Sequence, residues 1–389
     1  MKKIRIGYIS TAYTSKRNFL YATDHQYINL RPFYRFTLRY WLQKLFHIHM
    51  EGFHAAFFAR YFYDVAHFFN TISWDAHPWI TTGGGSIPYF SKEIQEYLYN
   101  DMDINAVKDK RLLEKGIAAC ASPYCKALFV NSYCSLKIET ELLSNFPEYE
   151  KNILRKLSVL YPPQRLIVQS VEEKIRLTRN NDKMTFIYVG HDFYRKGGLA
   201  VLRCFEQLSS EFDNFHVITI GSLRNDVPER FDSNMQNDAE RLIKQYNGTW
   251  LTHYYNLPNT DVLELIKRAD IGLLPTYSDV FGYSVLEMQA CGCPVISSDV
   301  RALPEINNNE CGWVMEIGNK TRHRELANIQ EVLDTREMET KLEYVVREIL
   351  VLGQIPVSMI QACLNRIVKY HSPAEHCKIL ENAYREAVK

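Results

Sequence analysis

The chain has 389 residues, of which 46% are hydrophobic and 23% are charged, and its formal net charge is +1. This is the composition of a globular protein that is longer than one hydrophobic core usually spans, so we expect two domains. A net charge so close to zero gives no overall attraction to nucleic acid, and we expect no nucleic-acid partner. The nine cysteines form no CxxC pair, which argues against a disulfide framework and favours a reducing cytoplasm.

Apolar, strand-like runs alternate with amphipathic helical stretches along the first 165 residues. The first run, IRIGYIS, is too short for a signal peptide and predicts a buried strand. Four further runs follow it: VAHFFNTI, PWITT, KALFVNS and LSVLYPPQ. This alternation is typical of a parallel sheet covered by helices on both faces. No stretch reaches 18 uncharged apolar residues, so we expect no membrane-spanning helix.

A second alternation begins at MTFIYVG, after two prolines that predict a linker near residues 161–168. The later strand-like runs are FHVITIG, TWLTHYY, DIGLLPT, PVISSD and CGWVMEI, each separated from the next by a helical pattern or a turn. Helical patterns dominate from about residue 324 to the end. We therefore predict an α/β fold of two Rossmann-like, doubly wound domains, 1–165 and 166–370, with a C-terminal helix over 371–389 that packs back on the first.

Basic residues gather at the first turn of the second alternation, in VGHDFYRKGG. The predicted strand ends at Gly190, a loop carries His191, Arg195 and Lys196, and Gly197 and Gly198 open a helix. Basic side chains beside the free amides of a helix N-terminus form a site for phosphate or pyrophosphate. The spacing is not GxGxxG, so the fingerprint of nicotinamide and flavin sites is absent. A solvated turn with a cationic rim is the alternative interpretation.

Two carboxylates flank the start of a later helix in this half. Asp279 follows the strand DIGLLPT, and Glu287 lies about one turn into the next helix. Unpaired backbone amides are expected at the helix start between them, which is formed by Phe281, Gly282, Tyr283 and Ser284. Ionised carboxylates accept hydrogen bonds from hydroxyls. The pattern therefore suits a ligand with phosphates in its middle and hydroxyls at both ends, such as a nucleotide-sugar.

These two turns resemble the signature of retaining glycosyltransferases of the GT-B architecture, in particular glycosyltransferase family 4 (glycosyl transferases group 1). The resemblance covers roughly residues 184–317. Its motif stands in this chain as Gly190 to Gly197, Pro275-Thr276, Asp279, Phe281-Gly282, Glu287, Gly292, Pro294-Val295 and Pro304-Glu305. The resemblance implies two Rossmann-like domains that face each other across a cleft.

The resemblance also implies roles for the residues of the motif. Lys196 would contact the donor diphosphate, and Glu287 would bind the ribose hydroxyls. Asp279 stands where the family usually has Glu and would hold hydroxyls of the transferred sugar. The amides from Gly282 to Ser284 would hold the distal phosphate. His191 replaces a common Arg or Asn, so neutralisation of the phosphates would depend on Lys196 or on a protonated His191.

The sequence of the first domain gives fewer indications of binding residues. The glycine-rich loop that the family often has after its first strand is missing. The family often has a histidine that touches the donor sugar. His67 and His77 are the candidates, and we favour His67 as a catalytic residue because its strand ends just beyond it. A histidine satisfied in the core is the alternative for each.

The activity that the resemblance implies is transfer of a hexose-type sugar with retention of configuration, in synthesis of cell-surface glycan, lipopolysaccharide or glycolipid. The donor would be a UDP- or GDP-linked sugar and the acceptor a hydroxyl of a glycan or lipid-linked substrate. We expect no cofactor and no metal, because no DxD-like pair sits at a metal-binding position of the other glycosyltransferase architecture, and because His47 and His49 lack further ligands at metal spacing. A GT-B phosphorylase, a sugar-nucleotide epimerase and a non-catalytic binding protein are the alternatives.

Aromatic and basic residues alternate on a predicted helix near residues 31–46. Phe33, Phe36 and Tyr40 recur at helical spacing, and Arg31, Arg35 and Arg39 lie on another face. Such a helix can lie on an anionic membrane surface, which would place a cytoplasmic enzyme peripherally at the inner face of the membrane. A core-facing aromatic stripe with a solvated basic side is the alternative.

Overall fold

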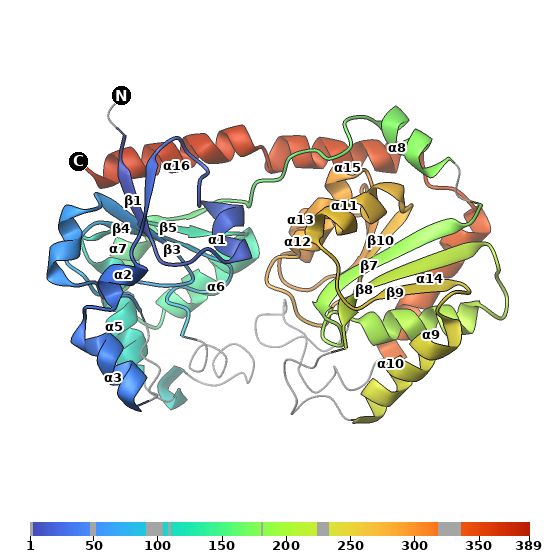
Figure 1. Cartoon of the computed structure of the whole chain (residues 1–389), viewed down its shortest axis with the longest axis horizontal. Helices are drawn as coiled ribbons and strands as arrows, with labels where there is room; N and C mark the ends of the chain where they lie inside the picture. Colours follow the sequence, from blue (N-terminus) through green and yellow to red (C-terminus); the bar gives the residue numbers. More distant parts are fainter. Residues whose placement is uncertain are drawn as a thin grey trace. The chain divides into compact units, whose positions relative to one another are not determined.

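The computed structural model describes residues 3–46, 52–90, 104–107, 110–179, 182–223, 233–317 and 336–389. The chain divides into two compact units, one formed by Met1–Pro163 with Ser372–Lys389 and the other by Gln164–His371 (Figure 1). The break follows the second of two adjacent prolines, two residues before the boundary drawn from the sequence. His47 and His49 lie outside the described residues, and within the described ranges no cluster of metal-ligating side chains occurs.

The first unit contains a parallel six-stranded sheet in the order β2-β1-β3-β4-β5-β6. Its strands are β1 (Arg5–Tyr8), β2 (Gln26–Asn29), β3 (Val65–Phe69), β4 (Trp79–Gly83), β5 (Cys125–Val130) and β6 (Leu157–Val159). Its helices are α1 (Tyr13–Asn18), α2 (Arg31–Tyr34), α3 (Leu38–Phe46), η1 (Phe57–Tyr61), η2 (Ile104–Ala106), α5 (Lys110–Ala121), α6 (Tyr133–Leu143), α7 (Pro147–Leu154) and α16 (Pro373–Ala387).

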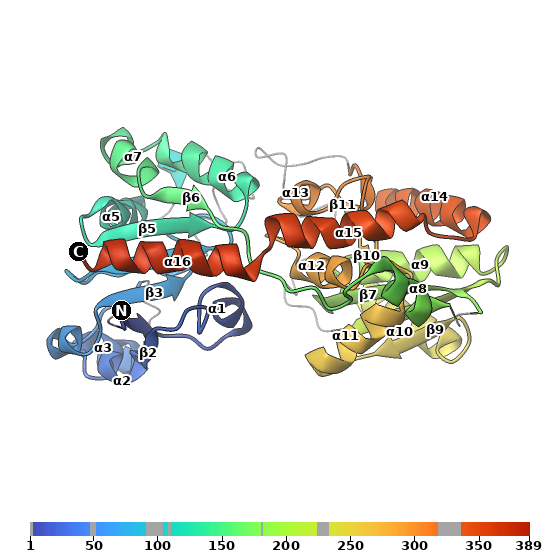
Figure 2. The ribbon, with the colours of Figure 1, turned by 90° about the horizontal axis from the view of Figure 1, so that it is seen from above.

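Helix α16 belongs to the first unit although it is the last element of the chain. It lies along β5 on one face of the sheet (Figure 2). Leu380 and Tyr384 are fully buried in the same cluster as Ile6 and Val65 of the central strands. His376 adds polar contacts to the backbone oxygens of Asn18 and Tyr161. The first core is therefore complete only with residues that follow the whole second unit.

The second unit contains another parallel six-stranded sheet, in the order β12-β11-β10-β7-β8-β9. Its strands are β7 (Met184–Asp192), β8 (Phe215–Ser222), β9 (Leu251–Tyr254), β10 (Ile271–Leu274), β11 (Val295–Ser298) and β12 (Gly312–Met315). Its helices are α8 (Val171–Thr178), α9 (Gly198–Leu208), α10 (Ser233–Tyr246), α11 (Asn259–Arg268), α12 (Tyr283–Ala290), α13 (Leu303–Ile306), α14 (Arg336–Leu352) and α15 (Val357–Tyr370). These two sheets confirm the predicted α/β class with two doubly wound halves.

The strand order of the second sheet reverses between β7 and β10. The chain first builds outward from β7 through β8 to β9, and then returns to the other side of β7 with β10. Ligands of open α/β sheets bind beyond the carboxyl ends of the strands at such a reversal. Both turns singled out in the sequence follow these two central strands.

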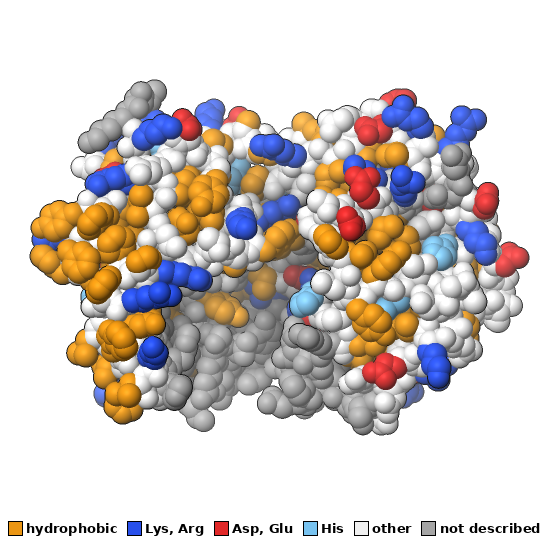
Figure 3. All heavy atoms as spheres, viewed as in Figure 1, with side chains coloured by type: hydrophobic (Ala, Val, Ile, Leu, Met, Phe, Trp, Pro, Cys, Tyr) orange, Lys and Arg blue, Asp and Glu red, His pale blue; other side chains and the backbone are white. Residues whose placement is uncertain are grey.

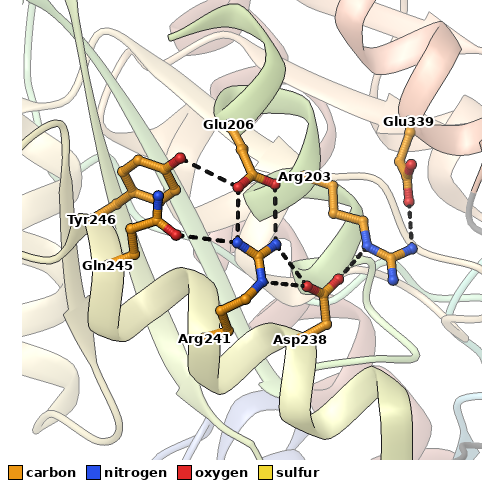
Figure 4. A network of polar contacts seen from close by, with 7 residues as sticks. All are labelled: Arg203, Glu206, Asp238, Arg241, Gln245, Tyr246 and Glu339. Atoms are coloured by element: carbon orange, nitrogen blue, oxygen red, sulfur yellow. Dashed lines mark hydrogen bonds and ion pairs between the residues drawn. The ribbon is translucent and has the colours of Figure 1, made fainter.

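An ion-pair network on one side of this sheet joins α9, α10 and α14 (Figure 4). Arg203 on α9 pairs with Asp238 at 2.7 Å and with Glu339 at 3.1 Å. Arg241 on α10 pairs with the same Asp238 and, at 3.0 Å, with Glu206. A network in which Arg203, Asp238 and Arg241 each have two partners holds helices more firmly than isolated surface pairs do. It therefore helps to hold α9, whose first residue follows the basic turn.

The turns after β7 and β10 touch through their backbones. Gly197 has φ of +82°, and a Cβ added to it would lie 1.9 Å from the backbone oxygen of Pro275. Tyr277 donates its amide to the oxygen of Arg195 at 3.0 Å. The Thr276 hydroxyl also lies 3.2 Å from that oxygen. Only glycine permits this approach, because any side chain would displace the second turn.

Replacing Gly197 by Ala should therefore destabilise the protein more than a positive φ alone explains. Gly248→Ala is the matched control, because Gly248 has φ of +89° with nothing within 4 Å of an added Cβ. The control should cost about 1–2 kcal/mol of unfolding free energy. Gly197→Ala should cost roughly 1–3 kcal/mol more, the range for overpacking. Denaturant unfolding of both variants measures this, and equal losses would contradict the proposed contact.

Candidate functional site

Lys196 and Asp279 form an ion pair at the point where the two turns meet. The Nζ of Lys196 lies 3.1 Å from Oδ2 of Asp279, and their side chains are 20% and 14% exposed. Burial alone would raise the pKa of Asp279, but the positive charges of Lys196 and Arg195 outweigh burial and hold that pKa below its ordinary value. Asp279 is therefore an ionised acceptor beside a cation, at the carboxyl end of the sheet.

Arg195 helps to hold the Lys196–Asp279 pair in place through its own contacts with the two turns. Its Nε contacts Oδ2 of Asp192, and its Nη1 donates to the backbone oxygen of Ser278. The hydroxyl of Ser298, at the end of β11, donates to the oxygen of Thr276. Arg195 was predicted as a donor-binding residue, whereas its contacts with Asp192 and Ser278 fasten the first turn to the second. Thr276 was predicted only as part of the family motif. The sequence gives no indication that its hydroxyl bridges the two turns.

Gly190 and His191 lie on β7 itself, because the strand extends to Asp192 and does not end at Gly190 as predicted. A Cβ added to Gly190 would lie 2.3 Å from the hydroxyl of Tyr188, so glycine at this position makes room for a buried tyrosine. The side chain of His191 is exposed near the end of the strand. It is therefore accessible, but on the strand rather than in the loop.

Helix α12 begins at Tyr283, four residues after Asp279, and the amide of Phe281 between them donates to Oδ1 of Asp279. Gly282 caps the helix with φ of +86°, and an added Cβ would lie 2.5 Å from Leu303. The ring of Phe281 is 1% exposed, so the backbone of this residue, and not its ring, is available to a ligand at the helix start. Tyr283 and Ser284 form the first turn, the part of a helix whose amides point away from the helix toward an approaching anion. The Ser284 hydroxyl is buried and has no hydrogen-bond partner among the described residues.

Glu287 lies on α12, four residues after Tyr283, and its side chain is buried. Lys196, Asp279 and the start of α12 are thus gathered by the chain at one end of the central strands, and Glu287 follows on the same helix. A cation, an ionised carboxylate and first-turn amides can together bind an anion that also carries hydroxyls.

His67 lies in the core of the first unit. It has no exposed surface, its Nδ1 lies 2.7 Å from the hydroxyl of Tyr384, and its Nε2 lies 2.9 Å from that of Thr82. The ring also stacks on Phe19. Burial lowers the pKa of His67 well below its ordinary value, so the ring is neutral. The structure gives His67 a core position in place of the predicted contact with a donor sugar.

His77 is half-buried and its Nε2 lies 3.1 Å from the backbone oxygen of Tyr63. Burial lowers the pKa of His77, and contacts with Tyr63 and Asp75 offset only part of this effect. Its surroundings are those of a side chain that supports the strand end rather than of an exposed ligand-binding group.

The first unit exposes a group of apolar side chains around α2, α3 and η1, which we call the aromatic patch. Its members are large side chains at least 43% exposed: Phe36, Leu38, Trp41, Leu45, Phe46, Phe57, Phe58, Tyr61 and Phe62. Basic side chains at the same elements are exposed too, namely Arg31, Arg35, Lys44 and Arg60. Figure 3 shows hydrophobic side chains gathered beside basic ones on this unit.

This patch corrects the prediction of one continuous helix near residues 31–46, and its exposed rings do not fit the alternative of a core-facing stripe. Helix α2 ends at Tyr34 and α3 begins at Leu38, so the predicted helix is two. Phe33 and Tyr40 are half-buried, but Phe36 is 71% exposed. Phe33 lies 6.0 Å from Phe58 and Phe36 lies 5.9 Å from it, measured between ring centroids, so the aromatic side chains form one surface. The side chain of Arg39 lies outside what the structure describes. Of the described helices, none has the length and apolar character needed to cross a membrane.

Comparison with known proteins finds similarity mainly in the second unit. Residues 170–348 match the family model for glycosyl transferases group 1. An uncharacterized glycosyltransferase of Methanocaldococcus jannaschii is 29% identical over 201 residues, which are 49% of this chain and 47% of that protein. The capsular polysaccharide biosynthesis glycosyltransferase CapM of Staphylococcus aureus is 27% identical over 140 residues, 36% of this chain and 34% of CapM. The chain thus spans half or less of the length of these curated relatives.

The similarity of fold extends over the whole chain. The structure of HepE from Anabaena in complex with UDP aligns with a TM-score of 0.58 and 11% identity, covering 98% of this chain and 99% of HepE. Both six-stranded parallel sheets belong to this shared architecture. Most of the second unit is therefore similar to glycosyl transferases group 1, and the chain has the fold of the GT-B glycosyltransferases.

Proposed function

We propose that this protein is a retaining glycosyltransferase of family 4 that uses a nucleoside-diphosphate sugar as its donor. The donor would carry a hexose-type sugar on UDP or GDP. The observation that carries the proposal is the ion pair of Lys196 with Asp279, at the strand reversal and beside the start of α12. A cation there suits the diphosphate, and the ionised carboxylate suits the hydroxyls of the sugar.

The proposed reaction breaks the bond between the anomeric carbon and the distal phosphate and forms a bond from that carbon to an acceptor oxygen. The acceptor proton passes to the leaving phosphate on the same face, so configuration is retained without a dedicated nucleophile. Lys196, together with His191 and the first-turn amides of α12, would stabilise the charge that develops on the diphosphate. Preorganised electrostatic stabilisation of this kind is usually a large part of catalysis. Glu287 would hold the ribose, and neither a metal nor a resident cofactor takes part.

The acceptor would be a hydroxyl of a glycan or of a lipid-linked substrate. The name of CapM, a capsular polysaccharide glycosyltransferase, supports a place in synthesis of cell-surface glycan, lipopolysaccharide or glycolipid. The alternatives differ in their products. A phosphorylase would consume inorganic phosphate, and an epimerase would release no nucleoside diphosphate, so product analysis separates both from transfer.

Binding of a nucleotide-sugar tests the donor assignment directly. UDP-, GDP-, ADP- and CMP-linked sugars should be compared by thermal shift. The matching donor should stabilise the native state by about 2.7 kcal/mol at a hundredfold excess over its Kd. Inorganic phosphate at equal concentration is the control for unspecific anion effects. A screen in which no nucleotide-sugar raises the melting temperature would refute the donor assignment.

Asp279 is the residue whose substitution is most informative. Asp279→Asn removes the negative charge that faces Lys196 and that would accept hydrogen bonds from hydroxyls of the donor sugar. It should lower kcat/KM roughly tenfold or more, the range for a hydrogen bond to a charged group. Asp279→Glu keeps the charge one methylene further out and should change the preference among donor sugars. Asp213→Asn, on an exposed loop of the same unit, is the matched control. Unchanged kinetics in Asp279→Asn would exclude a role for the carboxylate.

We further propose that the aromatic patch holds this cytoplasmic enzyme against an anionic membrane surface, where a lipid-linked acceptor is available. Exposed aromatic side chains insert at the headgroup boundary, and basic side chains attract anionic lipid. The exposed Arg35 and Lys44 flank the exposed Trp41 in the chain.

Vesicles that contain an anionic phospholipid test this surface. A double substitution of Arg35 and Lys44 by Gln should weaken binding roughly tenfold or more, because each basic residue near such a surface contributes about 1 kcal/mol. Trp41→Ser with Phe36→Ser should weaken it independently of salt. Tyr344→Ser with Val351→Ser, which removes exposed apolar side chains of α14, should leave binding unchanged. Equal cosedimentation of all variants would contradict the membrane proposal.

A further inference from the structure

We propose that Arg301 is an additional binding residue of this donor site and takes an oxyanion on the unpaired Nε and Nη2 of its guanidinium. The oxyanion is either the distal phosphate of the donor or a carboxylate on the transferred sugar. This inference rests on the proposed function and goes beyond it, because Arg301 belongs to neither of the two turns that define the site.

Arg301 is buried, and none of the described acidic side chains forms an ion pair with it. It lies in the turn between β11 and α13, and only 3% of its surface is exposed. Its Nε and Nη2 are buried and have no hydrogen-bond partner within the described part of the chain. Removing a guanidinium from water without pairing it is costly, since a buried charge is ordinarily paired or hydrogen-bonded. A ligand that brings the opposite charge would remove this cost.

The two unpaired nitrogens are the pair with which arginine grips a planar oxyanion. Arg5 shows this mode in the same chain, where Nε and Nη2 lie 3.3 Å and 2.7 Å from the two oxygens of Asp64. Bidentate contacts of this kind favour carboxylate and phosphate groups over neutral ligands. The free edge of Arg301 therefore selects for an oxyanion rather than for a hydroxyl or an amide.

The turn that carries Arg301 packs against the start of α12. Leu303 and Ile306 of α13 are the nearest atoms to a Cβ added at Gly282, at 2.5 Å and 3.2 Å. Gln289 of α12 donates to the backbone oxygen of Ile306 at 2.8 Å. Arg301 is thus two residues from a side chain that touches the cap of α12. The first turn of this helix adds amides and the unpartnered hydroxyl of Ser284, which suit the same ligand.

The backbone conformation of Arg301 allows a test by substitution with glycine. Its φ is +52°, a conformation that glycine adopts without strain. Arg301→Gly should therefore melt no lower than the wild type in the absence of ligand, because the change relieves both the strain and the unpaired charge. Arg301→Lys keeps the positive charge but lacks the planar guanidinium. It therefore tests whether two parallel hydrogen bonds are needed.

Titration calorimetry should compare the three proteins with UDP, GDP and the glucose and glucuronate derivatives of whichever nucleotide the wild type binds. We expect Arg301→Gly to bind roughly 10- to 100-fold more weakly, the loss that corresponds to a charge-assisted hydrogen bond. Arg301→Lys should fall between the two. Weaker binding of the nucleoside diphosphate itself identifies the distal phosphate as the partner. Weaker binding of the glucuronate derivative alone identifies a sugar carboxylate.

Two results would overturn the inference, and they differ from failure of the donor assignment. Full affinity of Arg301→Gly for every ligand that the wild type binds would show that Arg301 takes no part in binding. A lower melting temperature of ligand-free Arg301→Gly, with affinity retained once the variant is folded, would give Arg301 a structural role only. A wild type that binds neither nucleoside diphosphate nor any sugar derivative would instead refute the proposed function, and Arg301 with it.

Discussion

The close approach of two backbone segments at Gly197 and Pro275 is the constraint on which the donor-site geometry depends. The strands β7 and β10 are neighbours in the sheet, but their following turns meet only because residue 197 has no side chain. That contact brings a lysine from one turn to an aspartate from the other. The carboxylate is then kept ionised by adjacent cations at a place where burial alone would favour its protonation. The ionised pair at this site therefore depends on the packing of the two backbone segments, and not on the spacing of Lys196 and Asp279 along the chain.

The same end of the sheet is fastened by side chains that do not face a ligand. The guanidinium of Arg195 contacts Asp192 and the backbone oxygen of Ser278. The hydroxyl of Thr276 bridges the two turns. Tyr188 fills the space that Gly190 leaves. Residues of a sequence signature can thus be needed for two different reasons, one for binding and one for holding the binding groups in place. The structure separates these reasons, whereas the signature alone cannot.

Much of the fold could be predicted because the buried parallel strands are continuous apolar runs. The strand Gln26–Asn29 escaped prediction, since it lies at the edge of its sheet and its side chains are half-buried or exposed. The core alternative for His67 could not be selected from the sequence, because a strand end does not reveal what packs on it, here Tyr384 from the far end of the chain. Arg301 carried no signal, because only three-dimensional burial distinguishes an unpaired arginine from a solvated one. Local periodicity therefore predicts elements well, and long-range packing decides the rest.

The place of α16 in the first unit has a consequence for the order in which the protein can be made. The second unit is an insertion within the first: the chain leaves at Pro163 and returns at Ser372, and its two connecting segments are joined by a hydrogen bond of 2.8 Å from Gln164 to His371. During synthesis the second sheet emerges whole from the ribosome before Leu380 and Tyr384 exist. The inserted unit can fold while the first still exposes the apolar face that α16 will cover. The half of the molecule that is synthesised first is thus the one that finishes folding last.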